Sequence, residues 1–309
     1  MALEKLDFDA DGAEEIIVKN PALTAGVRPE QGGAVFMLDY RPAAFCLTNT
    51  FTRHKEAYHQ KLLQASMGQG QGGQPASIHD IVRVKEEGLA NHLIYDQHTR
   101  WLYQERLLRK QTGMEAYRKG EYTQLGDFID KPWHLAEAKE SGGVVTIRLE
   151  RKGIFHADGQ AQPLLIAKTF RINGSDPAIK TSYQILNASL APVSFLLAVE
   201  FNMTMLAADA DDRYWTGGAA SGKVRLKQTL ADEAVSWVGM RDDWAGFSVR
   251  VESALPFAAW RYPVETVSQS ESGFERTYQG SCLVAVREVD LAPGAEDEFN
   301  LDLIMKAER

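Results

Sequence analysis

Cysteine is scarce in this sequence, and two features are missing from it altogether: a metal-binding or redox cysteine pair and a long apolar run. Only Cys46 and Cys282 occur among the 309 residues, too far apart to form a CxxC motif. One long-range disulfide is an open alternative, but two unpaired, buried thiols fit a reducing compartment better. Because no stretch of about 18 apolar residues is present, a membrane-spanning helix is excluded.

Positive charge is also in short supply, which bears on the partners that the protein can bind. Lys and Arg number 34 against 42 Asp and Glu, so that the net charge is −8. Such a surface repels phosphate groups and offers no electrostatic footprint for nucleic acid or anionic lipid. The opening "MALEKLDFDADG" is acidic and poor in apolar residues, which excludes a signal peptide. We therefore expect a soluble, cytoplasmic protein without nucleic-acid or membrane partners.

What the sequence does contain is an alternation of apolar and polar residues, most clearly in its second half. In "GVVTIRLER", Val145, Ile147 and Leu149 share one face, which is typical of a half-buried strand. The same pattern recurs in "EIIVKN", "GGAVFMLDY", "LLIAKTFRI", "AIKTSYQIL", "GKVRLKQTL", "GFSVRVES", "SCLVAVREV" and "EFNLDLIM". Many closely spaced strands predict an all-β protein, a sandwich or barrel of antiparallel sheets. No linker or internal repeat interrupts the pattern, so residues 1–309 are expected to form one β-sandwich domain.

Helical patterning is confined to the region from about residue 52 to residue 118. "TRHKEAYHQKLLQA" contains good helix formers behind Thr52, which is a candidate N-cap. The glycine-rich "GQGQGGQP" that follows predicts a surface loop. A second short helix is expected to begin at Ser77 or Asp80.

An acidic segment near the start of the chain resembles the opening of a calcium-binding loop. Asp7, Asp9 and Asp11 stand at alternate positions before Gly12, which would permit the sharp turn of such a loop. The glutamate that completes an EF-hand loop is absent, because Val18 occupies its position. The alternative is a solvated acidic segment that holds no ion.

The stretch "NTFTRHKEAYHQKL" concentrates polar side chains and is the first candidate site. His54 and His59 are five positions apart, so they diverge around a helix and do not form the HExxH zinc pair. Arg53, Glu56 and His59 remain candidates for saccharide binding or for acid/base chemistry. The alternative is the solvated face of a helix.

Two more candidate sites depend on strand periodicity. "YDQHTRW" has Asp96, His98 and Arg100 at alternate positions, which in a strand would form one hydrogen-bonding row. Glu200 and Asn202 share a face of an otherwise apolar strand, where an unpaired charge would be costly. The alternatives are an exposed strand face for the first group and a satisfied buried carboxylate for the second.

Adjacent aromatic residues form the last candidate site. Tyr214 and Trp215 precede a glycine turn, and aromatic rings commonly pack on the C–H faces of pyranoses. The alternative is ordinary core packing of the tryptophan. The sequence has no GxxxxGK[ST] loop, no GxGxxG after a strand and no GxSxG turn, so nucleotide-binding and serine-hydrolase signatures are absent. No catalytic residue is predicted.

Several of these stretches together resemble the C-terminal domain of family-57 glycoside hydrolases, the prokaryotic alpha-amylase and 4-alpha-glucanotransferase enzymes. The resemblance runs in order from about residue 6 to about residue 305. It rests on "LDFDADGAEEIIVKN", "RPEQGGAVFMLDYRP", "NTFTRHKEAYHQKL", "SIHDIVRVKEEGLANHLIYDQHTRW", "FLLAVEFNMTML" and "YPVETVSQSESGFERTYQGSCLV".

The resemblance implies a galactose-mutarotase-like β-sandwich (a supersandwich). It also implies that the catalytic nucleophile and acid belong to an N-terminal, distorted (β/α) barrel, and no such βα pattern occurs here. No strand is expected before "LDFDADG", and this abrupt start favours a fragment of a larger enzyme over a free-standing copy. The family pattern points to a structured polar patch at Asn49, Arg53, Glu56, Tyr58 and His59.

Three hypotheses on function follow, and the first is a non-catalytic accessory domain. It would support the catalytic barrel of the same protein and bind α-glucan or malto-oligosaccharide itself. Its stacking platforms would be Tyr58, Trp101, Tyr214 or Trp215. The only cofactor that the sequence suggests is calcium.

The other two hypotheses come from different classes of protein. A mutarotase-like aldose epimerase would need a carboxylate base and a histidine acid, and Glu200 with His98 or His59 are the candidates. A purely structural or oligomerisation scaffold would bind no ligand and would expose a large apolar patch.

Overall fold

The computed structural model of the chain describes residues 1–68, 84–157, 159–218, 220, 222–271 and 273–308. Strands account for most of it, which confirms the predicted all-β class. In chain order the elements are β1 (Ala2–Leu6), β2 (Glu15–Lys19), β3 (Leu23–Arg28), β4 (Ala34–Tyr40), the 3₁₀ turn η1 (Arg41–Ala43), β5 (Phe45–Cys46), α1 (His59–Gly68), the 3₁₀ turn η3 (Leu89–His92), β6 (Leu102–Leu108), α2 (Met114–Lys119), β7 (His134–Ser141), β8 (Val144–Ala157), β9 (Gln160–Asn173), β10 (Ala178–Asn187), β11 (Val193–Met203), β12 (Arg213–Gly217), β13 (Val224–Arg225), β14 (Leu230–Asp242), β15 (Phe247–Ser270), β16 (Gly273–Leu291), β17 (Glu296–Asn300) and β18 (Asp302–Ala307).

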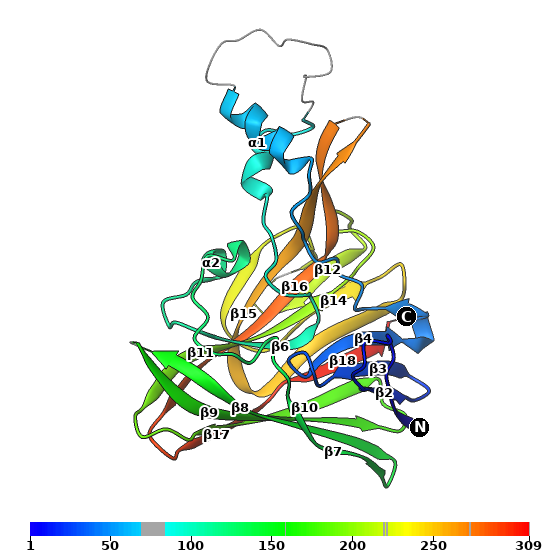
Figure 1. The fold of residues 1–309 in the computed structure, drawn as a ribbon. Coiled ribbons are helices and arrows are strands. Elements are labelled where there is room, and N and C mark those ends of the chain that lie inside the picture. Colours follow the sequence, from blue (N-terminus) through cyan, green and yellow to red (C-terminus); the bar gives the residue numbers. More distant parts are fainter. Residues whose placement is uncertain (69–83, 158, 219, 221, 272, 309) are drawn as a thin grey trace.

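The strands form two packed antiparallel layers (Figure 1). One layer contains β7, β8, β9, β10 and β17, and it crosses beneath the other in the view of Figure 1. The other layer runs through β3, β4, β6, β11, β16, β15 and β14. Strand β10 also pairs with β18, so it joins the two layers at a corner.

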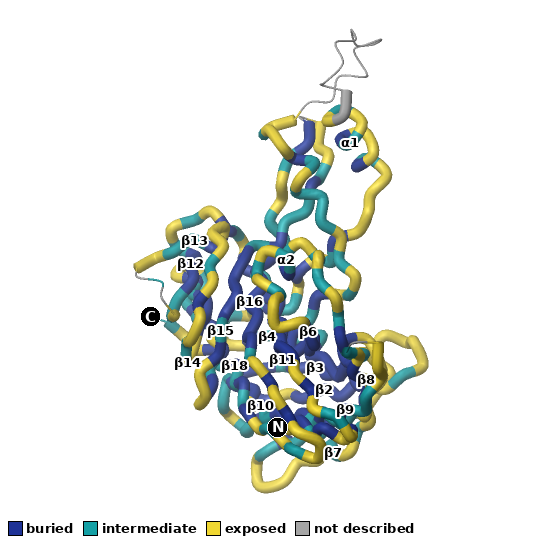
Figure 2. Tube along the Cα trace, turned by 90° about the vertical axis from the view of Figure 1, so that its left-hand side faces the viewer, coloured by how far each residue is buried: buried dark blue, intermediate teal, exposed yellow. Residues whose placement is uncertain are grey.

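The alternating pattern explains how the main core forms between the layers. On β8, Val145, Ile147 and Leu149 are fully buried, whereas the residues between them are only partly covered. Burying such side chains contributes about 1.5–3 kcal/mol each. Figure 2 shows the buried residues running along the strands and the exposed residues gathered at the turns.

Strand β11 is buried on both faces, and this property places the candidate site. Its odd-numbered residues, such as Leu197 and Phe201, belong to the main core. Its even-numbered residues, such as Leu196 and Ala198, belong to a second cluster with Tyr117 of α2. Helix α2 therefore covers the outer face of the layer that contains β11.

A narrow projection rises from the body of the sandwich, and we call it the stalk (Figure 1). It consists of α1, η3 and the tip of the β15–β16 hairpin. A small cluster of four buried residues holds these parts together: Leu62, Leu89, Val267 and Phe274. The register of β15 and β16 shifts between Val264 and Glu265, where the hairpin leaves the body.

Two sequence predictions around the stalk are wrong. The helix expected behind Thr52 begins only at His59, because the Thr52 hydroxyl accepts the backbone N–H of Arg100 and does not cap a helix. The expected strand at 95–101 is irregular and bends at residues 97–98. The predicted loop at 68–75 and the predicted helix start at Ser77 or Asp80 lie outside the described residues, except for Gly68 at the end of α1.

Three further predictions need correction. A strand does precede "LDFDADG", since β1 pairs with β2 along its whole length. "GKVRLKQTL" forms only the short β13 and then turns before β14. Both cysteines are free, as expected, but Cys46 is exposed and only Cys282 is buried.

In the parts of the chain that the structure describes, no helix has the length and hydrophobicity needed to cross a membrane.

Candidate functional site

Glu200 of β11 lies at the centre of a buried network of charged side chains. One of its carboxylate oxygens accepts hydrogen bonds from the Tyr117 hydroxyl at 2.6 Å and from Arg106 at 3.0 Å. The other accepts from the Asn202 amide at 2.6 Å and from Arg100 at 3.3 Å. Strands β6 and β11 and helix α2 thus converge on one carboxylate.

Arg100 extends this network to a second carboxylate. Besides its bond to Glu200, it donates two hydrogen bonds to Asp96, at 2.8 and 2.6 Å, and one to Asn202 at 2.9 Å. Arg53 binds the same Asp96 carboxylate through its backbone N–H at 2.8 Å and its guanidinium at 2.7 Å. The bend at residues 97–98 makes this possible, because it turns Arg100 back towards Asp96. We call Arg53, Asp96, Arg100, Arg106 and Glu200 the arginine network.

Electrostatics keep both acids of the arginine network ionised. Burial opposes the charge on Asp96, but the guanidinium groups of Arg100 and Arg53 outweigh it and hold the pKa of Asp96 far below its usual range. For Glu200, burial is likewise outweighed by Arg106 and Arg100, which lower its pKa. A carboxylate held in this way is a poor proton acceptor.

The space beside the arginine network is small. A hollow of about 30 Å³ lies over Asp96, His98 and Glu200. That volume admits one or two water molecules but not a pyranose ring. The hollow at the arginine network itself therefore has no room for a sugar.

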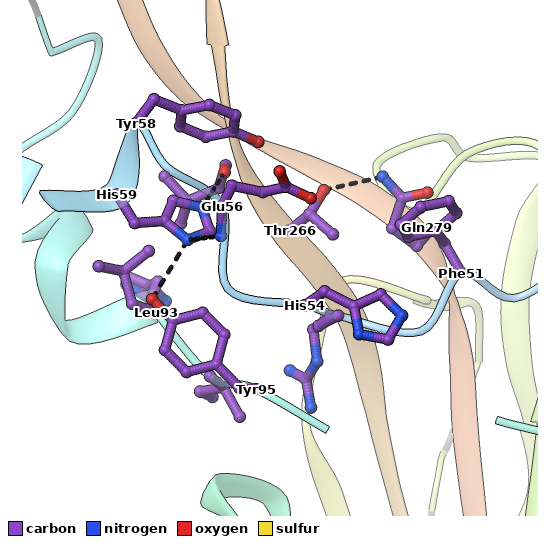
Figure 3. A pocket seen from close by; sticks show the side chains of 13 residues that line it. Phe51, His54, Glu56, Tyr58, His59, Leu93, Tyr95, Thr266 and Gln279 are labelled. Carbon is purple, nitrogen blue, oxygen red and sulfur yellow. Dashed lines mark hydrogen bonds between the residues drawn. The ribbon is translucent and has the colours of Figure 1, made fainter. Parts of the chain in front are cut away.

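A larger pocket of about 220 Å³ lies next to it at the base of the stalk, and we call it the stalk pocket (Figure 3). Arg53 and Tyr95 line both hollows, so the arginine network forms one wall of the pocket. Its lining residues are Phe51, Arg53, His54, Glu56, Tyr58, His59, His92, Leu93, Ile94, Tyr95, Thr266, Val267 and Gln279.

His59 is a fixed element of the stalk pocket. Its Nδ1 accepts the backbone N–H of Glu56 at 3.1 Å, and the Tyr95 hydroxyl lies 3.2 Å from the same atom. Its Nε2 lies 2.9 Å from the carbonyl oxygen of Val267, to which it donates. With both nitrogens engaged and 4% exposure, the ring joins the first residues of α1 to the β15–β16 hairpin.

The groups that remain accessible in the stalk pocket suit a polyhydroxylated ligand. The side chains of His54 and Glu56 are exposed, and Figure 3 shows them, with Thr266, among the residues that line the pocket. Burial raises the pKa of the Tyr58 and Tyr95 hydroxyls, so both remain neutral donors. Aromatic walls with amide, carboxylate and hydroxyl groups between them are the features that bind sugars.

The structure divides nine of the ten predicted saccharide-binding residues among three groups, with Arg53 in two of them, and leaves His98 apart. Arg53, Asp96, Arg100 and Glu200 belong to the arginine network, and Asn202 is hydrogen-bonded to it. Arg53, Glu56 and His59 line the stalk pocket. His98 belongs to neither set of hydrogen bonds, and its ring lies 3.8 Å from Asp130. Tyr214 and Trp215 form the third group and line neither hollow.

Trp215 is not available as a stacking platform, contrary to the sequence prediction. It is fully buried in the main core, and its indole N–H donates to the carbonyl of Gln228. The ring of Tyr214 is covered by Lys223, whose Nζ lies 4.7 Å from its centroid. Trp101, also proposed for stacking, packs against Phe36.

Sequence reasoning missed two members of the central cluster, Arg106 and Tyr117. Arg106 lies in "LYQERLL". The signal that could have identified it is the pair of charged residues, Glu105 and Arg106, within an otherwise apolar strand. Tyr117 lies on α2 and reaches Glu200 only because β6 pairs with β11.

The geometry of the central cluster disfavours the epimerase hypothesis, because Glu200 is bound to two arginines and His59 has both nitrogens engaged.

The predicted calcium ligands meet only in part. Asp7 and Asp9 lie close to Glu15, within 4.8 Å, whereas Asp11 is outside this group. The Arg28 guanidinium binds both Asp9 and Glu15, so a positive charge already stands between these carboxylates. This arrangement does not fit a calcium ion.

Comparison with known proteins gives a consistent result along almost the whole chain. Residues 7–301 match the family model described as "Alpha-amylase/4-alpha-glucanotransferase, C-terminal". The chain is 33% identical to alpha-amylase 1 of Dictyoglomus thermophilum over 292 residues, which are 94% of this chain and 40% of that protein. It is 27% identical to a 4-alpha-glucanotransferase of Thermococcus kodakarensis, covering 89% of this chain and 37% of that protein. The chain thus spans about two fifths of the length of these relatives.

Solved structures confirm the predicted galactose-mutarotase-like fold. A 4-alpha-glucanotransferase from Thermococcus litoralis superposes with a TM-score of 0.75 at 23% identity, covering 98% of this chain and 41% of that chain. A galactose mutarotase-like protein from Clostridium acetobutylicum superposes with a TM-score of 0.61 at 8% identity, covering 99% of each chain. At these identities the likeness concerns the fold alone.

Proposed function

Because this chain belongs to the C-terminal domain family of alpha-amylases and 4-alpha-glucanotransferases, we propose that it is an accessory domain of an α-glucan-processing enzyme. It supports the catalytic domain of the same protein and holds part of the glucan chain in the stalk pocket. It carries no catalytic residue of its own. We also propose a cytoplasmic location, which the two unpaired cysteines favour.

The observation that carries the proposal is the stalk pocket beside an immobile network of charges. Its volume of about 220 Å³ is somewhat below the range of about 300–1,000 Å³ that is common for ligand sites. One glucosyl unit with parts of its neighbours is therefore a reasonable occupant. Asp96 fixes the position of Arg53, and the Tyr95 hydroxyl lies 3.2 Å from His59 Nδ1, so little side-chain entropy is lost on binding.

The expected affinity is weak. A hydrogen bond to a sugar hydroxyl contributes roughly 1 kcal/mol net, so several bonds and one stacking contact are needed for millimolar binding. Glu56, Tyr58 and Gln279 offer such contacts, and Gln279 is oriented by a 2.8 Å hydrogen bond to Thr266 (Figure 3).

Calorimetric titration of the purified chain with maltoheptaose tests the proposal, with cellohexaose as the comparison ligand. We expect binding selective for the α-linked chain, weakened about fivefold in Glu56→Gln and in Tyr58→Ala. The matched control is Glu271→Gln, which removes a carboxylate at the hairpin tip outside the stalk pocket. If maltoheptaose produces no heat at millimolar concentration, the glucan-binding part of the proposal is lost and a scaffold without a ligand remains.

A further inference from the structure

A second hollow, far from the stalk in the fold, lies on the outer face of β14, β15 and β18, which Figure 2 labels together. Along β14, Val238 and Met240 face the main core, so Trp237, Gly239 and Arg241 face outward. The hollow has a volume of about 280 Å³.

Gly239 lies between Trp237 and Arg241 on β14, beside the hollow. Strand β14 pairs with β15 so that Gly239 lies opposite Arg250 and Arg241 lies opposite Ser248. The backbone of β15 approaches Gly239 closely on this face. A methyl group at this residue would lie 2.3 Å from the carbonyl oxygen of Val249, so only glycine fits.

One wall of the hollow is an aromatic ring. Trp237 is 38% exposed, although tryptophan side chains are usually well buried. It packs against Gly217, where an added methyl group would approach the ring to 2.6 Å. The Arg250 guanidinium lies 5.8 Å from the ring centroid, near the limit of about 6 Å for a cation–π contact, and leaves part of the ring open.

The opposite wall is a connected set of hydrogen-bonding groups. Arg241 donates to the Glu308 carboxylate at 2.8 Å, and the Ser248 hydroxyl donates to the other oxygen of the same carboxylate at 2.8 Å. Arg250 pairs with Glu252 at 2.8 Å. Arg241, Glu308, Arg250 and Glu252 are paired with opposite charges, and Lys306 adds one further positive charge to the lining. The hollow thus offers mainly paired hydrogen-bonding groups, which suit a neutral polar ligand.

The other large hollow on the sandwich lacks this combination of groups. It lies over β8, β9 and β10 and measures about 480 Å³. Its lining, from His134 to Glu296, contains no tryptophan, tyrosine or phenylalanine among the described residues. The larger volume of this hollow therefore does not make it the better candidate for a sugar site. The hollow at Trp237 is the better candidate, because it places an exposed indole opposite a carboxylate and a guanidinium group.

We propose that the hollow between Trp237 and Glu308 is a second saccharide subsite, which binds a neutral pyranose unit of an α-glucan chain. The indole face packs on the C–H face of the sugar, and Arg241, Ser248 and Glu308 bind its hydroxyls. The choice of an α-glucan rests on the proposed function. The subsite would hold a second part of the polymer, which raises the effective concentration of the chain at the stalk pocket.

Indole N–H signals in a nuclear magnetic resonance titration with maltoheptaose test this subsite. The sequence has six tryptophans, and Trp237→Ala identifies the signal of that ring. We expect this signal to shift with added maltoheptaose, and binding to weaken about fivefold in Trp237→Ala and less in Trp237→Phe. Ser248→Ala should also weaken binding, and it keeps the Trp237 signal. This variant therefore tests the subsite even if the tryptophan variants fold poorly. Trp244→Ala is the matched control, since this 69% exposed tryptophan does not line the hollow.

The outcomes separate this inference from the proposed function. None of the described residues that line the stalk pocket is a tryptophan, so its occupancy is followed through the His54 ring signals. If the His54 signals move and the Trp237 signal stays fixed up to about 10 mM maltoheptaose, the second subsite is overturned and the proposed function stands. If the Trp237 signal moves and the His54 signals stay fixed, the second subsite is supported and glucan binding in the stalk pocket is overturned. If neither set moves, both are overturned.

Discussion

Two buried charge clusters in this molecule have similar chemistry and different surroundings. In one, the Lys168 ammonium group donates to both oxygens of Glu105 at 2.8 Å and to the backbone carbonyls of Gly32 and Tyr103. The Tyr183 hydroxyl donates to Glu105 at 2.7 Å. Lys168, Glu105 and Tyr183 are completely enclosed in the main core.

The other cluster is the arginine network, which lies just below the surface at the base of the stalk. Arg53, Arg100 and Glu200 are 2–7% exposed, and of these Arg53 also lines the stalk pocket. Burial of charge therefore does not distinguish a structural ion pair from a candidate binding site. What distinguishes them is whether a hollow of ligand size meets the network.

The largest effect on stability is expected from breaking the enclosed pair. Lys168→Met should lower the free energy of unfolding by about 3–5 kcal/mol, because the Glu105 charge is left buried and unpaired. Urea unfolding measures the loss. The double variant Lys168→Met with Glu105→Leu should lose clearly less than Lys168→Met alone. An equal or greater loss would contradict the role assigned to the unpaired charge.

A smaller loss is expected when the arginine network is broken. Glu200→Ala should cost about 2–3 kcal/mol, because Arg106 loses its carboxylate while water can enter from the nearby hollow. Thermal unfolding at neutral pH is the measurement. Glu150→Ala is the control, since its pair with Arg148 is exposed and should contribute less than about 1 kcal/mol.

The two acids of the arginine network predict an acid-dependent loss of stability. Their pKa values are lowered in the folded protein, so the unfolded chain takes up protons first as the pH falls. The stabilisation is complete above the ordinary values of 4.5 for Glu200 and 3.8 for Asp96, and it is lost below them. Urea unfolding against pH should show this decline, and Asp96→Asn should flatten it. If the stability of Asp96→Asn declined with pH as steeply as that of the unchanged protein, the decline could not be assigned to Asp96.

The smallest effect on stability is expected in the stalk pocket itself. His54→Ala should change the free energy of unfolding by less than about 0.5 kcal/mol, because the ring is exposed. The same variant should weaken maltoheptaose binding in calorimetry if the ring contacts the sugar. A loss of stability comparable to that of Glu200→Ala would show that the pocket is structural after all.

Much of the sandwich was predictable, because strand alternation is a local property of the chain. The buried faces of β8 and the two contrasting faces of β11 follow directly from the order of their residues. The segment from Tyr95 to Trp101 shows the limit of this reasoning. Its alternation is as regular as that of a strand, but the hydrogen bonds of Asp96 to Arg53 and Arg100 stabilise a bend in its place.

Local order was sufficient to establish the all-β class and to single out most members of the polar patch, and the resemblance of several stretches indicated the family. Only the tertiary structure decided which of those polar groups support the fold and which are accessible to a ligand. The reason is that enclosure depends on contacts between distant segments: Arg100 reaches Glu200 and His59 reaches Val267 across long stretches of chain. The hollow at Trp237 has the same origin, since residues of β14, β15 and β18 line it together.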